Sequence, residues 1–92
     1  MNKPLKCLIL EDSISDQIAL EMILADYQNI NIKSISTPEQ FMCEITSQNY
    51  NLFMIDINLE SSITGIDLAM RIPDNSSWII FCSAADCDRY YK

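Results

Sequence analysis

The chain has 92 residues, of which 49% are apolar and 21% charged, so it fits one domain with one core and does not resemble a disordered chain. Its 13 acidic and 6 basic residues give a net charge of -7, which argues against nucleic acid or an anionic membrane surface as a direct partner. The absence of a membrane-length apolar run and of a signal-peptide pattern predicts a cytoplasmic protein.

The cysteines do not form a recognisable metal-binding pattern. Cys7, Cys43, Cys82 and Cys87 include no C-x-x-C pair, and the chain has no histidine. A zinc site would require four thiolates to converge from scattered elements. Cys7 and Cys82 lie within apolar runs, where a reduced cysteine packs as a small core residue.

The first predicted element is a buried strand over Leu5–Leu10, because this apolar run is too short for a helix and ends in polar turn residues. Ser13 and Ser15 are both candidate N-caps of the helix that follows, which is predicted over Asp16–Tyr27. The residues expected to form its inward apolar face are Ile18, Met22 and Ala25, flanked by Ala19 and Ile23.

A second strand is predicted over Ile32–Ser36, and a strong helix start follows it. Thr37 can cap the helix, Pro38 suits its first turn, and Gln40 lies three residues after the cap. The positions expected to face inward are Phe41 and Ile45, and the helix is expected to end near Gln48–Asn49.

The second half of the chain repeats the alternation. Leu52–Ile57 reads as a buried strand, Gly65–Met70 opens a helix that Pro73 must close, and Trp78–Cys82 is a further apolar strand. Asp86–Lys92 has the pattern of the first turns of another helix. Nearly continuous apolar strands that alternate with helices predict an α/β domain, spanning residues 1–92, with a parallel sheet covered on both faces.

Polar side chains gather where these strands end. Glu11 and Asp12 follow the first strand, Asp56 lies near the end of the Leu52–Ile57 strand, and Ser83 follows the last one. Parallel strands place their carboxyl ends on one rim, which is where open α/β sheets bind ligands. We therefore expect these residues to become neighbours.

Three crowded carboxylates repel one another unless a cation neutralises them, and hard oxygen ligands on an open rim suit Mg²⁺. Asp56 could then act as a nucleophile toward a phosphoryl group. A simpler alternative is that Glu11 and Asp12 only favour the start of the following helix. That alternative does not explain Asp56, because an unpaired carboxylate within an apolar strand would be costly.

The sequence resembles the receiver domains of response regulators, in the CheY-like superfamily. The motifs that carry this resemblance are LILEDS, FMIDINL, the later Gly65 before a helix, and IIFCSA, and together they span the chain from about Lys6 to its end. The resemblance implies a flavodoxin-like, doubly wound parallel sheet with strand order 2-1-3-4.

The resemblance also implies a role for each rim residue. Asp56 corresponds to the phosphorylated aspartate, and Glu11 and Asp12 to the pair that binds Mg²⁺. Asn58 would offer its backbone carbonyl to the metal. Ser83 corresponds to the hydroxyl residue that hydrogen-bonds the phosphoryl group, and Ala84 to the small residue beside it.

The chain departs from the family at its C-terminal end, where it lacks the fifth strand, with its lysine and aromatic switch residue, and the fifth helix. We therefore expect an incomplete receiver domain with weak or abolished phosphorylation-dependent switching. The strand at Trp78–Cys82 would form an exposed sheet edge, which predicts a homodimer through that edge.

The leading interpretation is a two-component signalling module that accepts a phosphoryl group on Asp56 from a histidine kinase or phosphotransfer protein, and is not a turnover enzyme. One alternative is a phosphorylation-independent interaction module, or pseudo-receiver, or an inactive receiver fragment. Another is a phosphatase or phosphotransferase of the haloacid dehalogenase class, but that class requires a second aspartate where this chain has Asn58.

Overall fold

The structure is a computed structural model that describes residues 3–27, 29–57, 59, 63–73 and 77–82. Along the chain these form β1 (Leu5–Leu10), α1 (Ile14–Leu24), β2 (Ile30–Ile35), α2 (Pro38–Ser47), β3 (Leu52–Asp56), α3 (Gly65–Ala69) and β4 (Trp78–Cys82). The predictions for Asn58, Ser83, Ala84, Cys87 and Asp86–Lys92 fall outside the described residues.

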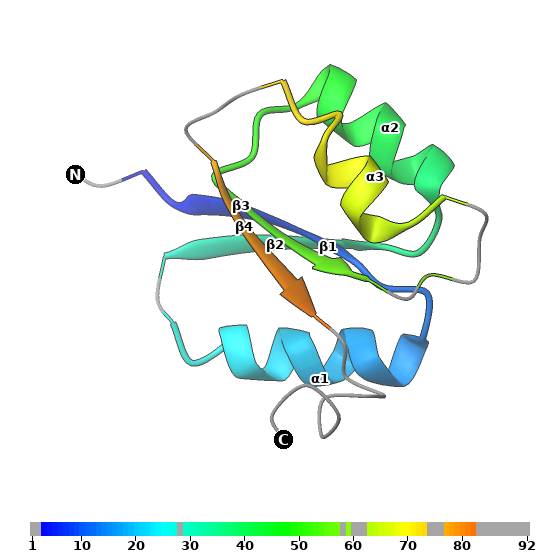
Figure 1. The fold of residues 1–92 in the computed structure, drawn as a ribbon. Helices are drawn as coiled ribbons and strands as arrows, with labels where there is room; N and C mark the ends of the chain where they lie inside the picture. The colour runs from blue at the N-terminus through cyan, green and yellow to red at the C-terminus, as the bar shows by residue number, and fades with distance from the viewer. Residues whose placement is uncertain (1–2, 28, 58, 60–62, 74–76, 83–92) are drawn as a thin grey trace.

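The four strands form one parallel sheet in the order β2-β1-β3-β4, which confirms the predicted strand order. Helix α1 lies on one face of the sheet, and α2 and α3 lie on the other (Figure 1). Because Leu10 of β1 pairs with Ile55 of β3, the residues that follow these two positions are level with each other at the carboxyl rim.

Side chains alternate between two cores, as the pleat of a strand requires. The larger core lies on the side of α2 and α3, and its most buried members are Leu8, Leu10, Phe41, Phe53, Ile55 and Leu68. The smaller core lies on the side of α1 and contains Cys7, Ile9, Leu24 and Met54, with Cys82 packed against it. Cys7 is thus a core residue as predicted, whereas Cys82 is only partly buried.

Helix α2 begins as the sequence predicts. The hydroxyl of Thr37 accepts a hydrogen bond from the Gln40 backbone N–H at 3.1 Å, and the Gln40 side chain accepts one from the Thr37 N–H at 3.2 Å. Pro38 occupies the first turn, and Phe41 and Ile45 face the core. Local capping chemistry therefore accounts for the start of this helix.

Helix α1 differs from the prediction. It begins at Ile14 with Ser13, and not Ser15, as its N-cap, and it ends at Leu24. Its inward residues are Gln17, Leu20 and Leu24, whereas the residues predicted to face inward point to solvent: Ile18, Met22 and Ile23 are 51%, 68% and 58% exposed, and Ala19 and Ala25 also lie outside the core. The helix is apolar nearly all round, so periodicity could not identify the packed face.

Two strands differ slightly from their predicted bounds. Asn29 adopts a left-handed backbone with φ 66°, which asparagine tolerates, and the turn places Ile30 opposite Leu5. Because of its pairing with β1, β2 starts at Ile30, two residues before the predicted start at Ile32. Strand β3 ends at Asp56, one residue before its predicted end.

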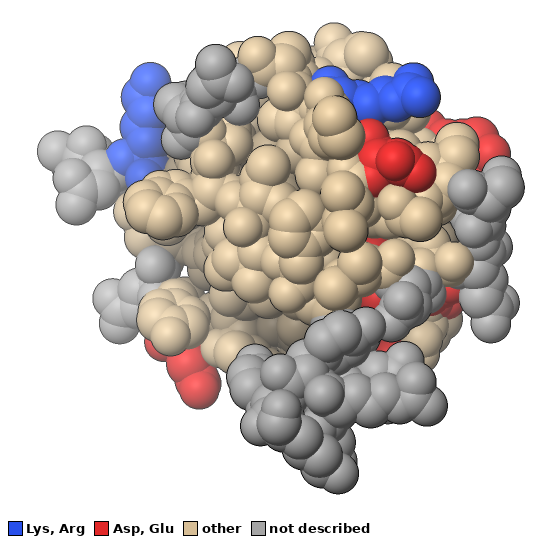
Figure 2. All heavy atoms as spheres, viewed as in Figure 1, with Lys and Arg blue, Asp and Glu red and all other residues tan. Residues whose placement is uncertain are grey.

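Strand β4 occupies an edge of the sheet in the described part of the chain, and its apolar side chains are exposed. Trp78 is 77% exposed, and Ile79, Ile80 and Phe81 are 38–46% exposed. The expectation that both faces of the sheet are covered is thus wrong at β4. Figure 2 shows the face on which β4 and α3 lie: Lys, Arg, Asp and Glu appear mainly toward its margins, and other residues cover its centre.

None of the helices in the described ranges combines the length and the apolar character that a membrane crossing requires.

Candidate functional site

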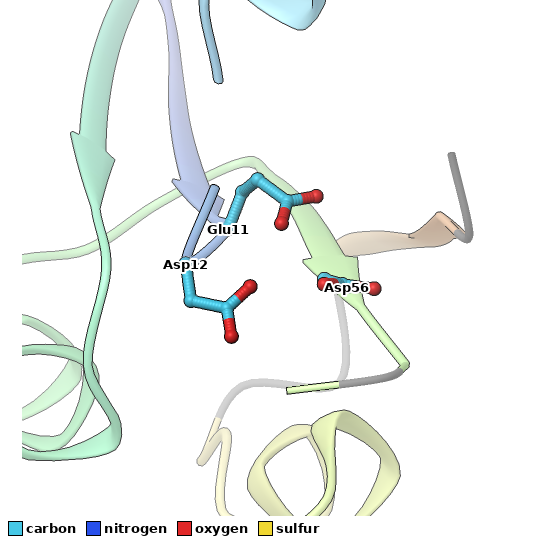
Figure 3. A group of neighbouring side chains, drawn as sticks. All are labelled: Glu11, Asp12 and Asp56. Carbon is cyan, nitrogen blue, oxygen red and sulfur yellow. The ribbon is translucent and has the colours of Figure 1, made fainter. Parts of the chain in front are cut away.

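The three predicted carboxylates meet at the carboxyl rim of the sheet. Glu11 and Asp12 directly follow β1, and Asp56 is the last residue of β3. Figure 3 shows the Glu11 and Asp12 side chains directed toward Asp56. One carboxylate oxygen from each residue lies within 4.8 Å of the others. The structure thus brings Asp56 together with Asp12 and Glu11, which lie 44 and 45 positions before it in the sequence.

The site is largely enclosed by the protein. Glu11 is 2% exposed and Asp56 is 7% exposed, while Asp12 is partly buried. Burial of carboxylates is unfavourable unless they are protonated, hydrogen-bonded or neutralised by a cation. A cluster of this kind therefore differs from the acidic residues that commonly lie on a solvated surface.

The backbone around Glu11 is held at several points. Its N–H donates to the Ile35 carbonyl at 3.0 Å, and its own carbonyl accepts from Gln17 Nε2 at 2.6 Å. The Ser13 N–H donates to Glu11 Oε2 at 3.2 Å. Ser13, and not an acidic side chain, caps α1. The alternative in which Glu11 and Asp12 serve only to start the helix leaves their convergence with Asp56 unexplained.

The electrostatics of the site reflect this crowding. The pKa of Glu11 is raised from its ordinary value of 4.5 to about 8, chiefly by burial and then by hydrogen bonding to Asp56, the charge of Asp56 and hydrogen bonding to Asp12. The Ser13 N–H opposes the rise. Near neutral pH, Glu11 therefore retains a proton within the cluster, and a bound cation would take over the role of that proton.

The donor set fits a small divalent cation. Mg²⁺ prefers oxygen ligands at about 2.0–2.1 Å, so oxygens on opposite sides of the ion are about 4 Å apart. One carboxylate oxygen each of Glu11, Asp12 and Asp56 lies within 4.8 Å of the others, which is close to that separation. Three protein ligands also leave room for the waters that Mg²⁺ retains.

Two residues near the site carry further information. Burial raises the pKa of the Cys82 thiol, and the charges of Glu11 and Asp56 raise it further, so this thiol stays protonated at neutral pH.

Gln17 was not among the predicted site residues, because a polar residue early in an apolar helix gives no periodic signal. The predicted contributions of Asn58 and Ser83 concern residues outside the described ranges.

Comparison with known proteins agrees with this architecture. No protein-family model matches the sequence, and no curated protein matches it. Among solved structures, the MaeR response regulator bound to beryllium trifluoride is 22% identical, with a TM-score of 0.75 over 95% of this chain and 75% of that one. A response regulator receiver protein from Pseudomonas putida is 19% identical, with a TM-score of 0.73 over 99% and 78% of the two chains.

A third similar structure is the response regulator TrrA from Thermotoga maritima in complex with Mg²⁺-BeF. It is 17% identical and has a TM-score of 0.68 over 95% of this chain and 94% of that one. All three proteins are response regulators, and the matches cover nearly all of this chain. The described residues therefore have the fold of response regulator receiver domains, with four parallel strands and no fifth strand within the described ranges.

Proposed function

We propose that this chain is a receiver domain of two-component signal transduction, which binds Mg²⁺ through Glu11, Asp12 and Asp56 and accepts a phosphoryl group on Asp56. The observation that carries this proposal is the convergence of these three carboxylates, with oxygens within 4.8 Å, at the carboxyl rim of a receiver-like sheet. The rim is also where ligands of open α/β folds bind.

The proposed step is phosphoryl transfer from a phosphohistidine. A carboxylate oxygen of Asp56 attacks phosphorus, an O–P bond forms as the P–N bond breaks, and the imidazole nitrogen leaves with the electron pair. Mg²⁺, when bound, would reduce repulsion between the anionic nucleophile and the anionic phosphoryl group.

The complexes named for two similar proteins support this chemistry. Beryllium trifluoride is bound to MaeR, and a Mg²⁺-BeF complex is bound to TrrA. Trifluoroberyllate occupies the place of a phosphoryl group on an oxygen nucleophile, so an equivalent complex at Asp56 is the proposed counterpart in this chain.

We further propose that its partners are a histidine kinase or a phosphotransfer protein in the cytoplasm, and that it acts as a phosphoacceptor without turnover of a free substrate. A net charge of -7 disfavours direct binding to nucleic acid.

A second candidate function, phosphorylation-independent protein interaction, is favoured by a different observation. Large apolar side chains are exposed on α1, where Met22 is 68% exposed, and on β4, where Trp78 is 77% exposed. Exposed apolar surface of this kind often marks an interaction site. Removal of the phosphoacceptor Asp56 should abolish the first function, whereas a phosphorylation-independent protein interaction should persist.

The test is to incubate the chain with Mg²⁺ and either beryllofluoride or acetyl phosphate, and to measure the intact mass and ligand binding. The wild type is expected to gain one phosphoryl group and to bind beryllofluoride only when Mg²⁺ is present. Asp56→Asn should abolish both, whereas Asp26→Asn, the same change at an exposed position of the chain, should abolish neither. Lack of any Asp56-dependent signal in the wild type would contradict the phosphoacceptor proposal.

A further inference from the structure

Gln17 is a buried polar residue on the face of α1 that packs against the sheet. It is 9% exposed, and its side-chain nitrogen Nε2 donates to two backbone carbonyls, that of Glu11 at 2.6 Å and that of Ile35 at 3.0 Å. Ile35 is the last residue of β2, and Glu11 directly follows β1. One amide group therefore links α1 to the carboxyl ends of two neighbouring strands.

This link fixes the backbone of Glu11 from both sides. The Glu11 N–H donates to the Ile35 carbonyl at 3.0 Å, so that carbonyl accepts from both Glu11 and Gln17. The Glu11 carbonyl is held by Gln17 at the short distance of 2.6 Å. Rotation of the peptide group between Glu11 and Asp12 would break this second bond, because the carbonyl oxygen belongs to that group.

The first turn of α1 also holds the side chain of Glu11. The Ser13 N–H donates to Glu11 Oε2 at 3.2 Å, while the Ser13 hydroxyl caps the helix by accepting from the Asp16 N–H. Residues 13 to 17 thus contact Glu11 at its carboxylate and at its carbonyl. The direction in which Glu11 and Asp12 present their oxygens to Asp56 depends on this turn.

From these contacts we infer that Gln17 is a positioning residue for the metal site: its amide holds the peptide that carries both Glu11 and Asp12. The inference rests on the proposed function, because it assumes that these two residues bind Mg²⁺. Groups that orient metal ligands without touching the metal typically contribute about 10- to 100-fold to metal affinity. Displacement of ligands by about 0.5 Å is enough to lose such precision.

The experiment compares variants that remove the donor and keep the size of the side chain. Gln17→Met retains the length and favours a helix, and Gln17→Glu retains the shape but replaces the donating nitrogen with oxygen. The control is Ser77→Ala, since the Ser77 hydroxyl also donates to a backbone carbonyl, that of Tyr50 at 2.8 Å, before β4 at the opposite end of the sheet. Mg²⁺ affinity is measured by calorimetry under conditions in which every variant is fully folded by circular dichroism.

Both Gln17 variants are expected to bind Mg²⁺ at least about tenfold more weakly than the wild type, and Ser77→Ala to bind it with unchanged affinity. The electron paramagnetic resonance spectrum of bound Mn²⁺, which reports ligand geometry, should change in the Gln17 variants alone. Unchanged affinity and an unchanged spectrum in the folded Gln17 variants would overturn the positioning role and leave the proposed function intact. Absence of Asp56-dependent Mg²⁺ binding in the wild type would instead overturn the proposed metal site, and the positioning role with it.

Discussion

Gly65, the first residue of α3, packs directly against the backbone of Asp56. A Cβ atom added at Gly65 would lie 2.1 Å from the Asp56 carbonyl oxygen and 2.8 Å from a methyl carbon of Ile55. The φ of Gly65 is not positive, so the position requires glycine for space and not for conformation. The start of α3 thus fixes the end of β3, where the proposed phosphoacceptor lies.

Gly65→Ala is therefore expected to displace the Asp56 backbone. Overpacking of this kind typically destabilises a protein by about 1–3 kcal/mol, and loss of site geometry should also weaken Mg²⁺ binding. Urea denaturation and calorimetry measure the two effects. Ile66→Ala is the control, because Ile66 is next to Gly65 in α3 but 50% exposed. If Gly65→Ala matched that control in both measurements, the close packing would not determine the site.

The contacts of Gly65 and Gln17 show what could and could not be read from the sequence. The strand pattern, the capping of α2 by Thr37 and the convergence of Glu11 with Asp56 depend on local chemistry and on the rule that parallel strands end on one rim, so they were predictable. The face of α1 that packs against the sheet was not predictable. Apolar residues lie on nearly every side of this helix, and Gln17, the residue that faces the rim, is polar. A buried hydrogen bond between elements leaves no periodic trace in a sequence.

Stability without metal should fall as the pH rises from about 4.5 to about 8. The pKa of Glu11 is about 8 in the folded protein, so the folded chain retains a proton that the unfolded chain loses near pH 4.5. The stabilisation is fully present below the unfolded pKa and disappears as the pH passes the folded one. The slope approaches about 1.4 kcal/mol per pH unit for one proton, and urea denaturation at several pH values measures it.

Two comparisons isolate the contribution of Glu11 from those of other titrating groups. Glu11→Gln is neutral at every pH, so the difference in unfolding free energy between wild type and variant should shift in favour of the variant as the pH rises. Saturating Mg²⁺ should reduce the slope of the wild type, because a cation replaces the proton. Parallel pH curves for wild type and Glu11→Gln would show that Glu11 titrates normally.

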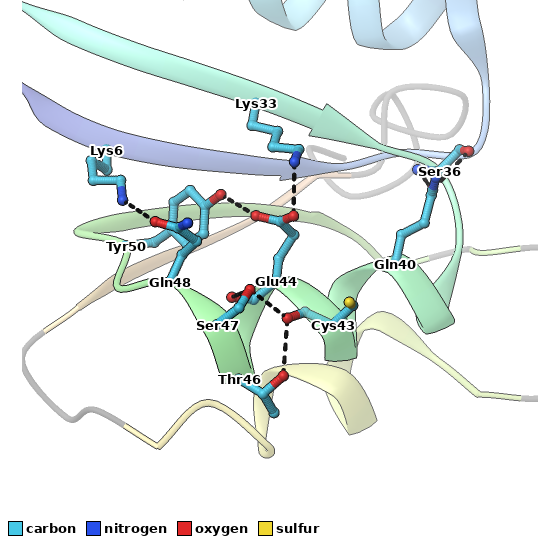
Figure 4. A network of polar contacts seen from close by, with 10 residues as sticks. All are labelled: Lys6, Lys33, Ser36, Gln40, Cys43, Glu44, Thr46, Ser47, Gln48 and Tyr50. Atoms are coloured by element: carbon cyan, nitrogen blue, oxygen red, sulfur yellow. Dashed lines mark hydrogen bonds and ion pairs between the residues drawn. The ribbon is translucent and has the colours of Figure 1, made fainter.

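A polar network between α2 and the strands β1 and β2 is expected to stabilise the fold (Figure 4). The Tyr50 hydroxyl donates to Glu44 Oε1 at 2.5 Å, Lys33 Nζ donates to Glu44 Oε2 at 2.8 Å, and Lys6 Nζ lies 5.2 Å from the centre of the Tyr50 ring. Tyr50→Phe removes one hydrogen bond and is expected to cost about 1 kcal/mol of unfolding free energy, measured by urea denaturation. Thr46→Ala, an exposed change in the same helix, should cost less.

The loss of unfolding free energy caused by Tyr50→Phe should depend on pH. Hydrogen bonding from Lys33, and then from Tyr50, lowers the pKa of Glu44. A lowered pKa contributes stability that is present above the unfolded value and is lost as the pH falls through the folded value. The difference between wild type and Tyr50→Phe should therefore shrink in acid. A difference that stays constant as Glu44 is protonated would mean that Tyr50 does not act through this carboxylate.

The exposed edge at β4 predicts self-association. Unpaired strand edges with apolar side chains favour pairing with another chain, and a twofold dimer would join two β4 strands antiparallel. Because each chain carries a net charge of -7, added salt should strengthen the dimer by screening repulsion. Size-exclusion chromatography with light scattering, repeated over a range of protein and salt concentrations, measures the mass.

Single charges can locate the surface that associates. Ile80→Lys places a charge on β4, where Ile80 is 46% exposed, and should yield a monomer. Met22→Lys places the same charge on α1, where Met22 is 68% exposed, and should leave the dimer intact. The reverse result would move the interface to α1, whose outer apolar side chains also lack cover in the described structure. A wild type that stays monomeric at high concentration and high salt would instead mean that neither surface binds a second copy, and its exposed apolar residues would then be available to a different partner.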